Sequence, residues 1–157
     1  MTILLKQRFI IYETTKQKFC NLVYFTLFLS AFSAATFLPV VSEAVLAYDI
    51  VAGHNIYALL SVATLGNTFG SCVNYFLGKK GLDYLEKKRY IKMASLKKAK
   101  TLFDRYGAVV LLLSWAPIVG DPITFVAGVL HYDFKRFFLL VLLAKGVRYI
   151  LFALFFI

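Results

Sequence analysis

The sequence predicts an all-α integral membrane protein made of two inverted repeats, each a re-entrant hairpin followed by a transmembrane helix. Of its 157 residues, 61% are hydrophobic, and the mean hydropathy is +0.74. Soluble domains contain about 45–50% apolar residues, so this chain is too apolar for one aqueous core. Its charges gather between long uncharged runs, and one turn motif occurs twice. We expect about three full spans and two hairpins.

The N-terminal part divides into a basic segment and the start of the membrane domain. In residues 1–18 the charges are spread out, without the short apolar core of a signal peptide. We therefore interpret 1–18 as a basic interfacial segment. Residues 19–157 form a single membrane domain, and the uncharged run 19–42 is long enough for one helical crossing.

A second uncharged run, 55–78, is also long enough to cross. The following linker, 79–105, carries ten Lys or Arg residues against three acids. Cytoplasmic loops of membrane proteins collect basic residues, which makes this linker cytoplasmic. Its apolar residues fit one side of an amphipathic surface helix that binds anionic head groups. They are Ile91, Ala94, Leu102, Phe103 and Tyr106.

The C-terminal third predicts a hairpin and a last crossing. The apolar stretch 106–120 is about half the length of a helical span, and a second short piece runs from 123 to 130. Pro117, Gly120, Asp121 and Pro122 break the apolar run at this point. Such broken segments are tolerated in a membrane where protein or a wet cavity surrounds them. The stretch 137–157 is one full crossing with Lys145 and Arg148 in its middle.

An internal repeat relates the two halves. The turn at 117–121 (PIVGD) echoes the turn at 39–43 (PVVSE), at an offset of 78, and Gly146 follows Gly66 at an offset of 80. We assign Pro39, Pro117 and Gly120 to the hairpin turns. Inverted repeats of this kind are typical of secondary transporters, whose sites lie near the midplane. A strict repeat brings the first hairpin in from outside, whereas the basic N-terminus favours a cytoplasmic start; the run 19–42 satisfies either.

The charged residues of the apolar segments are the main candidates for function. A charge near the bilayer centre costs about 2.5–3.5 kcal/mol, so Glu43 and Asp121 need a partner or a role. Reversible protonation would suit a proton-coupled carrier; a salt bridge or a turn at the interface are the structural alternatives. Lys145 and Arg148, at i and i+3, could neutralise these acids or bind an anionic head group. We expect Glu43, Asp121 and Arg148 to form one coupled cluster.

The remaining polar residues are weaker candidates. Asn67, Ser71 and Asn74 follow one helical stripe, which fits either a polar path or ordinary bonding between helices. Cys20 and Cys72 lack metal-ligand spacing, so we expect no metal and no cofactor. We assign no chemistry to His54 and His131.

These motifs resemble the DedA family (the SNARE-associated or VTT membrane domain), most closely its YqaA-type branch, over roughly residues 28–150. Two blocks carry the resemblance. The first is Pro39, Glu43, Gly53, Gly66-Asn67, Gly70, Tyr75, Gly78 and Gly81; the second is Arg105-Tyr106-Gly107, Leu113-Ser114-Trp115-Ala116-Pro117, Gly120-Asp121, Ala127-Gly128, Gly146, Arg148 and Tyr149.

The resemblance implies two facing re-entrant hairpins, a role in membrane homeostasis, and translocation of lipids or lipid carriers such as undecaprenyl phosphate, with proton dependence. The chain departs from the broader family in one respect. That family has arginines three residues before and after the hairpin proline, where this chain has Ser114 and Gly120. A phosphate clamp made of those arginines is therefore absent.

The sequence thus predicts a multi-pass protein of the inner (cytoplasmic) membrane that transports or flips a lipid or lipid carrier, with proton coupling. Its partners would be anionic or phosphate-bearing lipids and protons, and oligomerisation stays open. The alternative is a structural or assembly protein that transports nothing. We expect no enzyme, because no catalytic Ser/His/Asp set and no HExxH motif is present. Nucleic-acid binding is excluded, because the basic residues do not form a face with interleaved aromatics.

Overall fold

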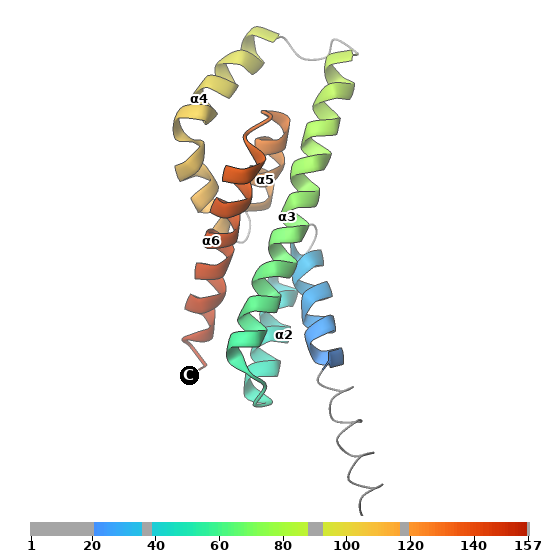
Figure 1. Cartoon of the computed structure of the whole chain (residues 1–157), viewed down its shortest axis with the longest axis vertical. Coiled ribbons are helices and arrows are strands. Elements are labelled where there is room, and N and C mark those ends of the chain that lie inside the picture. Colours follow the sequence, from blue (N-terminus) through green and yellow to red (C-terminus); the bar gives the residue numbers. More distant parts are fainter. Residues whose placement is uncertain (1–20, 36–38, 88–92, 117–119, 157) are drawn as a thin grey trace, which may run out of the picture.

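The computed structural model describes residues 21–35, 39–87, 93–116 and 120–156, and within these ranges the chain is helical with no strand. A first helix, Asn21–Ala34, precedes α2 (Pro39–Val51), α3 (Ile56–Lys87), α4 (Met93–Leu112), the 3₁₀ turn η1 (Leu113–Trp115), α5 (Gly120–Val129) and α6 (Phe134–Ala153). The helices lie roughly along one long axis (Figure 1). This confirms the all-α class.

One described helix, α3, is long and apolar enough to cross a membrane by itself, over Ile56–Gly81. At 1.5 Å per residue these 26 residues extend about 39 Å, more than the roughly 30 Å of a hydrocarbon core. A helix long enough for the crossing expected at 55–78 is therefore present. The 20 residues of α6 also reach about 30 Å, but four basic residues lie within the helix.

The run 19–42, long enough for one crossing, does not form a single continuous helix. The first helix ends at Ala34, and a new helix begins at Pro39. Proline favours the first helical position because it has no N–H to leave unpaired there, so Pro39 begins α2 instead of continuing the helix before it. The described helix has 14 residues, which extend about 21 Å and fall short of a full span. In Figure 1 the first helix and α2 run in opposite directions.

The second half follows the same course. α4 and η1 run along the molecule from one end towards its middle, α5 turns back towards that end, and α6 then runs to the opposite end, where the C-terminus lies (Figure 1). Pro117, assigned to the turn between η1 and α5, lies outside the described residues. Pro122 lies in the first turn of α5, where its missing N–H leaves no helical bond unmade.

The junctions after the two short helices α2 and α5 show the repeat most directly. At the first, Gly53 has a positive φ of 81°, and the N–H groups of Gly53 and His54 donate to the carbonyls of Ile50 and Asp49. At the second, His131 has a φ of 53°, and His131 and Tyr132 donate to Gly128 and Ala127. Both are helix endings with a left-handed residue after the last turn, and each pair of equivalent residues is separated by 78 positions.

The helix starts that follow these endings are also equivalent. The side chain of Asn55 accepts a hydrogen bond from the N–H of Ala58 at 3.2 Å, and that of Asp133 accepts one from Arg136 at 2.9 Å. Asn and Asp favour this capping position because their oxygens satisfy free N–H groups of the first turn. Asn55 and Asp133 again differ by 78 positions.

The expected equivalence of Gly66 and Gly146, at an offset of 80, is wrong. Gly66 lies against the backbone of Phe28, where an added Cβ would come within 2.6 Å of the carbonyl oxygen, whereas a Cβ at Gly146 would meet the Thr64 methyl at an ordinary 3.6 Å. The first glycine permits close helix packing and the second does not, so their spacing reflects no common role.

Glycines let α3 pack closely against both halves. Gly66 and Gly70 face the backbone of the first helix at Phe28 and Phe32. Further along α3, Gly78 faces the backbone of Phe125, and Gly128 of α5 faces the carbonyl of Tyr75. Small residues are enriched at membrane helix interfaces because they allow backbones to approach. The first helix, α2, α5 and α6 thus pack on α3, whereas α4 packs on α5 and α6.

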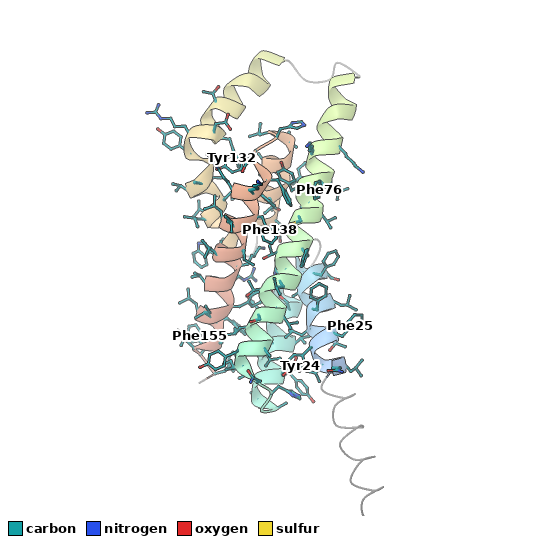
Figure 2. The ribbon with its side chains drawn as sticks, viewed as in Figure 1. Tyr24, Phe25, Phe76, Tyr132, Phe138 and Phe155 are labelled. Atoms are coloured by element: carbon teal, nitrogen blue, oxygen red, sulfur yellow. The ribbon has the colours of Figure 1, made fainter. Side chains whose placement is uncertain are left out.

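Aromatic side chains concentrate around the α5–α6 junction. Figure 2 labels three of them, Phe76, Tyr132 and Phe138. The ring centroid of Tyr75 lies 4.7 Å from that of Phe137 and 5.5 Å from that of Phe134, while the ring centroids of Phe103 and Tyr132 are 5.2 Å apart. Phe103 is buried and Tyr106 is exposed. The expectation that these two residues share the membrane face of a surface helix is therefore wrong, because Phe103 packs against Tyr132.

Candidate functional site

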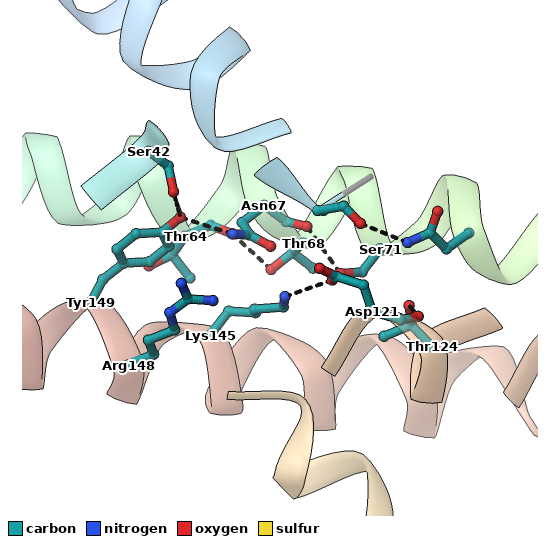
Figure 3. Close-up of polar contacts among 12 residues, drawn as sticks. Ser42, Thr64, Asn67, Thr68, Ser71, Asp121, Thr124, Lys145, Arg148 and Tyr149 are labelled. Atoms are coloured by element: carbon teal, nitrogen blue, oxygen red, sulfur yellow. Dashed lines mark hydrogen bonds and ion pairs between the residues drawn. The ribbon is translucent and has the colours of Figure 1, made fainter. Parts of the chain in front are cut away.

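The candidate site is built on the inner side of α6. Lys145, Arg148 and Tyr149 project there from adjacent turns of the helix, with relative exposures of 1%, 6% and 0% (Figure 3). Their spacing of three and four residues places them on one side of an α-helix. Two cations inside an apolar bundle require acidic partners, since an unpaired buried charge is strongly unfavourable.

Arg148 finds its partner on α2. Its Nε and Nη2 atoms donate to the same oxygen of Glu43, Oε1, at 3.0 and 2.7 Å. The two residues are 105 positions apart and belong to different halves of the repeat. This ion pair therefore joins the first half to the second.

Lys145 finds its partner on α5, within its own half. Its Nζ donates to Oδ1 of Asp121 at 3.1 Å. The cluster expected from the sequence thus consists of two ion pairs, and the direct partner of Asp121 is Lys145 and not Arg148. Arg148 still acts on Asp121 electrostatically. All four charged residues singled out in the sequence come together.

Tyr149 connects three elements beside these pairs. Its hydroxyl accepts a hydrogen bond from Nδ2 of Asn67 on α3, at 2.8 Å, and donates one to Oγ of Ser42 on α2, at 3.1 Å. Sequence reasoning gave Ser42 and Tyr149 no individual role. Their positions beside Glu43 and Arg148 were the available signal, because neighbouring residues on α2 and α6 meet across the same contact.

The polar stripe on α3 is mostly engaged in bonds between or within helices. Nδ2 of Asn74 donates to the carbonyl of Ala35 at 2.8 Å, and Oγ of Ser71 donates to the carbonyl of Asn67 at 3.1 Å. Asn67 and Asn74 thus make the bonds to other segments that the interhelical interpretation expects, whereas Ser71 bonds within α3. The polar path stays a prediction. The Oδ1 atom of Asn67 is buried without a hydrogen-bond partner.

The assigned turn residues begin the short helices. Pro39 is the first residue of α2 and Gly120 the first of α5. Gly120 packs against the backbone of Ser114, which leaves no room for a Cβ. Ser114 is itself buried, so this close contact requires glycine at position 120.

Two cavities border this region. One of about 190 Å³ lies beside the Glu43–Arg148 pair. Another of about 450 Å³ lies between α3 and α6, lined mainly by apolar residues around Ser61, Thr64 and Gly146. Within the described part of the chain, no group of three or more His, Cys, Asp or Glu residues could hold a metal ion.

Comparison with known proteins gives the family. The VTT domain matches residues 39–157. A protein of Haemophilus influenzae, named only as uncharacterised, is 36% identical over 132 residues, covering 79% of this chain and 81% of the relative. The inner membrane protein YqaA of Escherichia coli K12 is 35% identical over 127 residues, covering 80% and 85%.

An uncharacterised protein of the archaeon Methanocaldococcus jannaschii is 28% identical over 142 residues, covering 87% of this chain and 88% of the relative. No solved structure matches the chain significantly. The match to the domain covers α2 to α6 and every residue of the two ion pairs. The chain is therefore a membrane protein that belongs to the VTT domain family, the DedA family.

Proposed function

We propose that this protein is a transporter of the inner membrane that translocates a lipid or lipid carrier with an anionic head, coupled to protons, and that it is not an enzyme. One observation carries the proposal. Two carboxylates on the short helices α2 and α5 pair with two buried cations on one long helix, next to buried polar residues such as Ser42 and Asn67. Ionisable groups inside membrane segments commonly mark substrate or proton pathways.

The proposed placement in the membrane makes each short-helix pair a re-entrant hairpin. The described part of the first helix and α2 extend about 20 Å each, less than the hydrocarbon core. With the basic linker 79–105 in the cytoplasm, the α2–α3 connection lies on the outer side, because it is at the other end of α3. The first hairpin then comes in from outside and the second from the cytoplasm, as a strict inverted repeat requires.

The proposed chemistry is an exchange of partners. Arg148 remains protonated under physiological conditions, whereas a carboxylate can take up a proton. Protonation of an acid would release a cation on α6 to an anionic head group, and loss of the proton would restore the ion pair. Lys145 and Arg148 would thus hold the substrate alternately with Asp121 and Glu43.

A reconstituted assay tests this proposal. Purified protein is placed in liposomes that contain a fluorescent anionic phospholipid. The protein should speed the movement of this phospholipid between leaflets, and the movement should be faster with a pH gradient than without one. The Glu43→Gln variant should lose the effect of the gradient. Asp104→Asn, which removes an exposed carboxylate on α4, is the matched control and should behave as the original protein. Equal lipid movement in liposomes with and without protein would reject translocation.

A structural role is the second candidate. The bonds of Tyr149 to Asn67 and Ser42, and of Asn74 to Ala35, tie helices together and need no substrate. Under this alternative, variants at Glu43 and Asp121 that remain folded should fully support a cell lacking the original gene. Loss of support with normal protein levels would favour transport.

A further inference from the structure

The cavity of about 190 Å³ has a polar end and apolar walls. Its lining residues are Glu43, Trp115, Arg148, Leu151, Phe152 and Phe155. Trp115 and Phe155 are 47% and 87% exposed, so the cavity opens at the surface of the bundle, near the end of α6 where Figure 2 labels Phe155. In a membrane protein this surface faces lipid. The cavity therefore leads from the lipid phase to an ion pair.

The two ion pairs differ in their access to this cavity. Glu43 and Arg148 both line it, whereas Asp121 and Lys145 line neither this cavity nor the larger one between α3 and α6. The pairs also differ in what they join. Glu43–Arg148 connects the two halves of the repeat, while Asp121–Lys145 lies within the second half. Only the first pair can meet a molecule arriving by this route, and its opening would loosen the halves from each other.

The hydrogen-bond geometry leaves Arg148 suited to another anion. A guanidinium matches a carboxylate or phosphate best when two parallel N–H groups reach two oxygens. Here Nε and Nη2 both reach one oxygen of Glu43. A phosphodiester, with two free oxygens, could use the same two donors in the preferred arrangement.

We propose that this cavity binds the singly charged phosphodiester head of an anionic lipid, and that the head replaces Glu43 on Arg148 when Glu43 takes up a proton. This deepens the proposed function and rests on it for the nature of the substrate. The cavity is smaller than the roughly 300 Å³ at which pockets for drug-sized ligands begin. It therefore holds a head group while the acyl chains stay in the bilayer.

Charge balance couples the two events. Glu43, Asp121, Lys145 and Arg148 together are neutral. An added phosphodiester alone would leave one negative charge in an apolar site, and a proton taken from water onto the Glu43 carboxylate restores neutrality. The charged or titratable groups facing Glu43 are Arg148 and Tyr149 on α6. Arg148 stays protonated throughout, and the Tyr149 hydroxyl keeps its bonds to Asn67 and Ser42.

The chain offers a direct reporter, since Trp115 is its single tryptophan and lines the cavity. The full-length protein is placed in nanodiscs of phosphatidylcholine and titrated with phosphatidylglycerol brominated near the head-group end of its acyl chains. Bromine quenches tryptophan fluorescence on contact. Quenching should saturate at a lower lipid fraction at pH 5.5 than at pH 8, by up to about tenfold per pH unit for one linked proton.

The variants sharpen this test. Glu43→Gln imitates the protonated acid and should bind with the higher affinity at both pH values. Arg148→Lys keeps the charge but lacks the fork, and should bind more weakly. Asp104→Asn, with one exposed carboxylate removed, should keep the full pH dependence. Brominated phosphatidylcholine serves as the zwitterionic control and should quench equally at both pH values.

Quenching by phosphatidylglycerol that does not change with pH in the original protein would overturn the proposal, and that result needs no variant to fold. Equal quenching by the two lipids would also overturn it. The assay measures binding and not movement between leaflets. pH-linked binding without translocation would reject the transport function and support this binding site. Translocation with pH-independent binding would support the transport function and reject this binding site.

Discussion

Arg148 and Lys145 are cations buried on a single helix, and each has one carboxylate on a neighbouring helix. Removing one member of a buried pair typically costs about 3–5 kcal/mol, because the other charge is stranded. Removing both costs less, since nothing is left uncompensated. The identity of each pair can therefore be measured through coupling between substitutions.

For the second pair, we expect Lys145→Met to lower the unfolding temperature strongly and the double variant Lys145→Met with Asp121→Asn to recover much of the loss. The combination of Asp121→Asn with Arg148→Ala should show weaker coupling, because these residues share no direct bond. Thermal unfolding in detergent, monitored by circular dichroism, gives the coupling in both double-mutant cycles, Lys145 with Asp121 and Asp121 with Arg148. Stronger coupling of Asp121 to Arg148 than to Lys145 would contradict the pairing in the structure.

Tyr149 makes its contribution through two hydrogen bonds, to Asn67 and Ser42. Tyr149→Phe keeps the ring and removes both. Hydrogen bonds between membrane helices average about 0.6 kcal/mol and reach about 1.7, so we expect a loss of about 1–2 kcal/mol of unfolding free energy. Tyr57→Phe, on an 80% exposed ring, is the control. An unchanged stability for Tyr149→Phe would mean that these bonds contribute nothing.

At the scale of elements, the structure depends on backbone contacts between α3 and its neighbours. A Cβ at Gly128 would meet the carbonyl of Tyr75, and one at Gly78 would meet that of Phe125; neither backbone atom can move aside as a flexible side chain would. The α3–α5 contact therefore tolerates only glycine at both positions. Without it, α5 could not bring Asp121 to Lys145.

We expect Gly128→Ala to reduce the yield of folded protein sharply and to separate α5 from α3. Gly81→Ala adds the same methyl group in the same class of helix, but nothing lies within 4 Å of it, and alanine is the better helix former by about 1 kcal/mol. That variant should be as stable as the original or more so. The two variants are compared by the area of the monodisperse peak in size-exclusion chromatography and by the unfolding temperature. Similar losses of folded protein in both variants would show that the close contact at Gly128 does not determine stability.

At the scale of the whole molecule, α3 places the α2–α3 connection and the α5–α6 junction at opposite ends (Figure 1). Asn55 and Lys135 are exposed at these two ends, and Val126, in the middle of α5, is also exposed at the protein surface. In a membrane the first two would face water on opposite sides, whereas Val126 would face lipid.

In a background without Cys20 and Cys72, we expect Asn55→Cys to react with a bulky impermeant maleimide from outside and Lys135→Cys from the cytoplasm. Val126→Cys should react slowly from either side, although its side chain is exposed in the protein. Labelling rates in intact cells and inverted vesicles make the comparison. Rapid labelling of Val126→Cys would place α5 in water and remove the re-entrant arrangement.

The features of this protein that depend on local chemistry could be predicted from the sequence. Hydropathy and charge distribution predict a helical membrane protein, and the two Pro-containing motifs locate the starts of α2 and α5. The offset of 78 could also have been read from Asn55 and Asp133, as well as from the turn motifs. A capping residue bonds to an N–H only a few positions away, so its role can be predicted from the local sequence. Gly53 and His131 carry the same offset, but histidine is not a residue from which a left-handed turn would be inferred.

Which charges pair could not be predicted from the sequence, because the pairing depends on how helices far apart in the chain pack. Glu43 and Asp121 occupy equivalent positions, yet one pairs across the repeat and the other within it. The reason lies in the long helices, which are not equivalent in charge. Both cations are on α6, whereas α3 has the neutral Asn67 at the position that matches Lys145, so both acids must turn to the same helix for neutralisation.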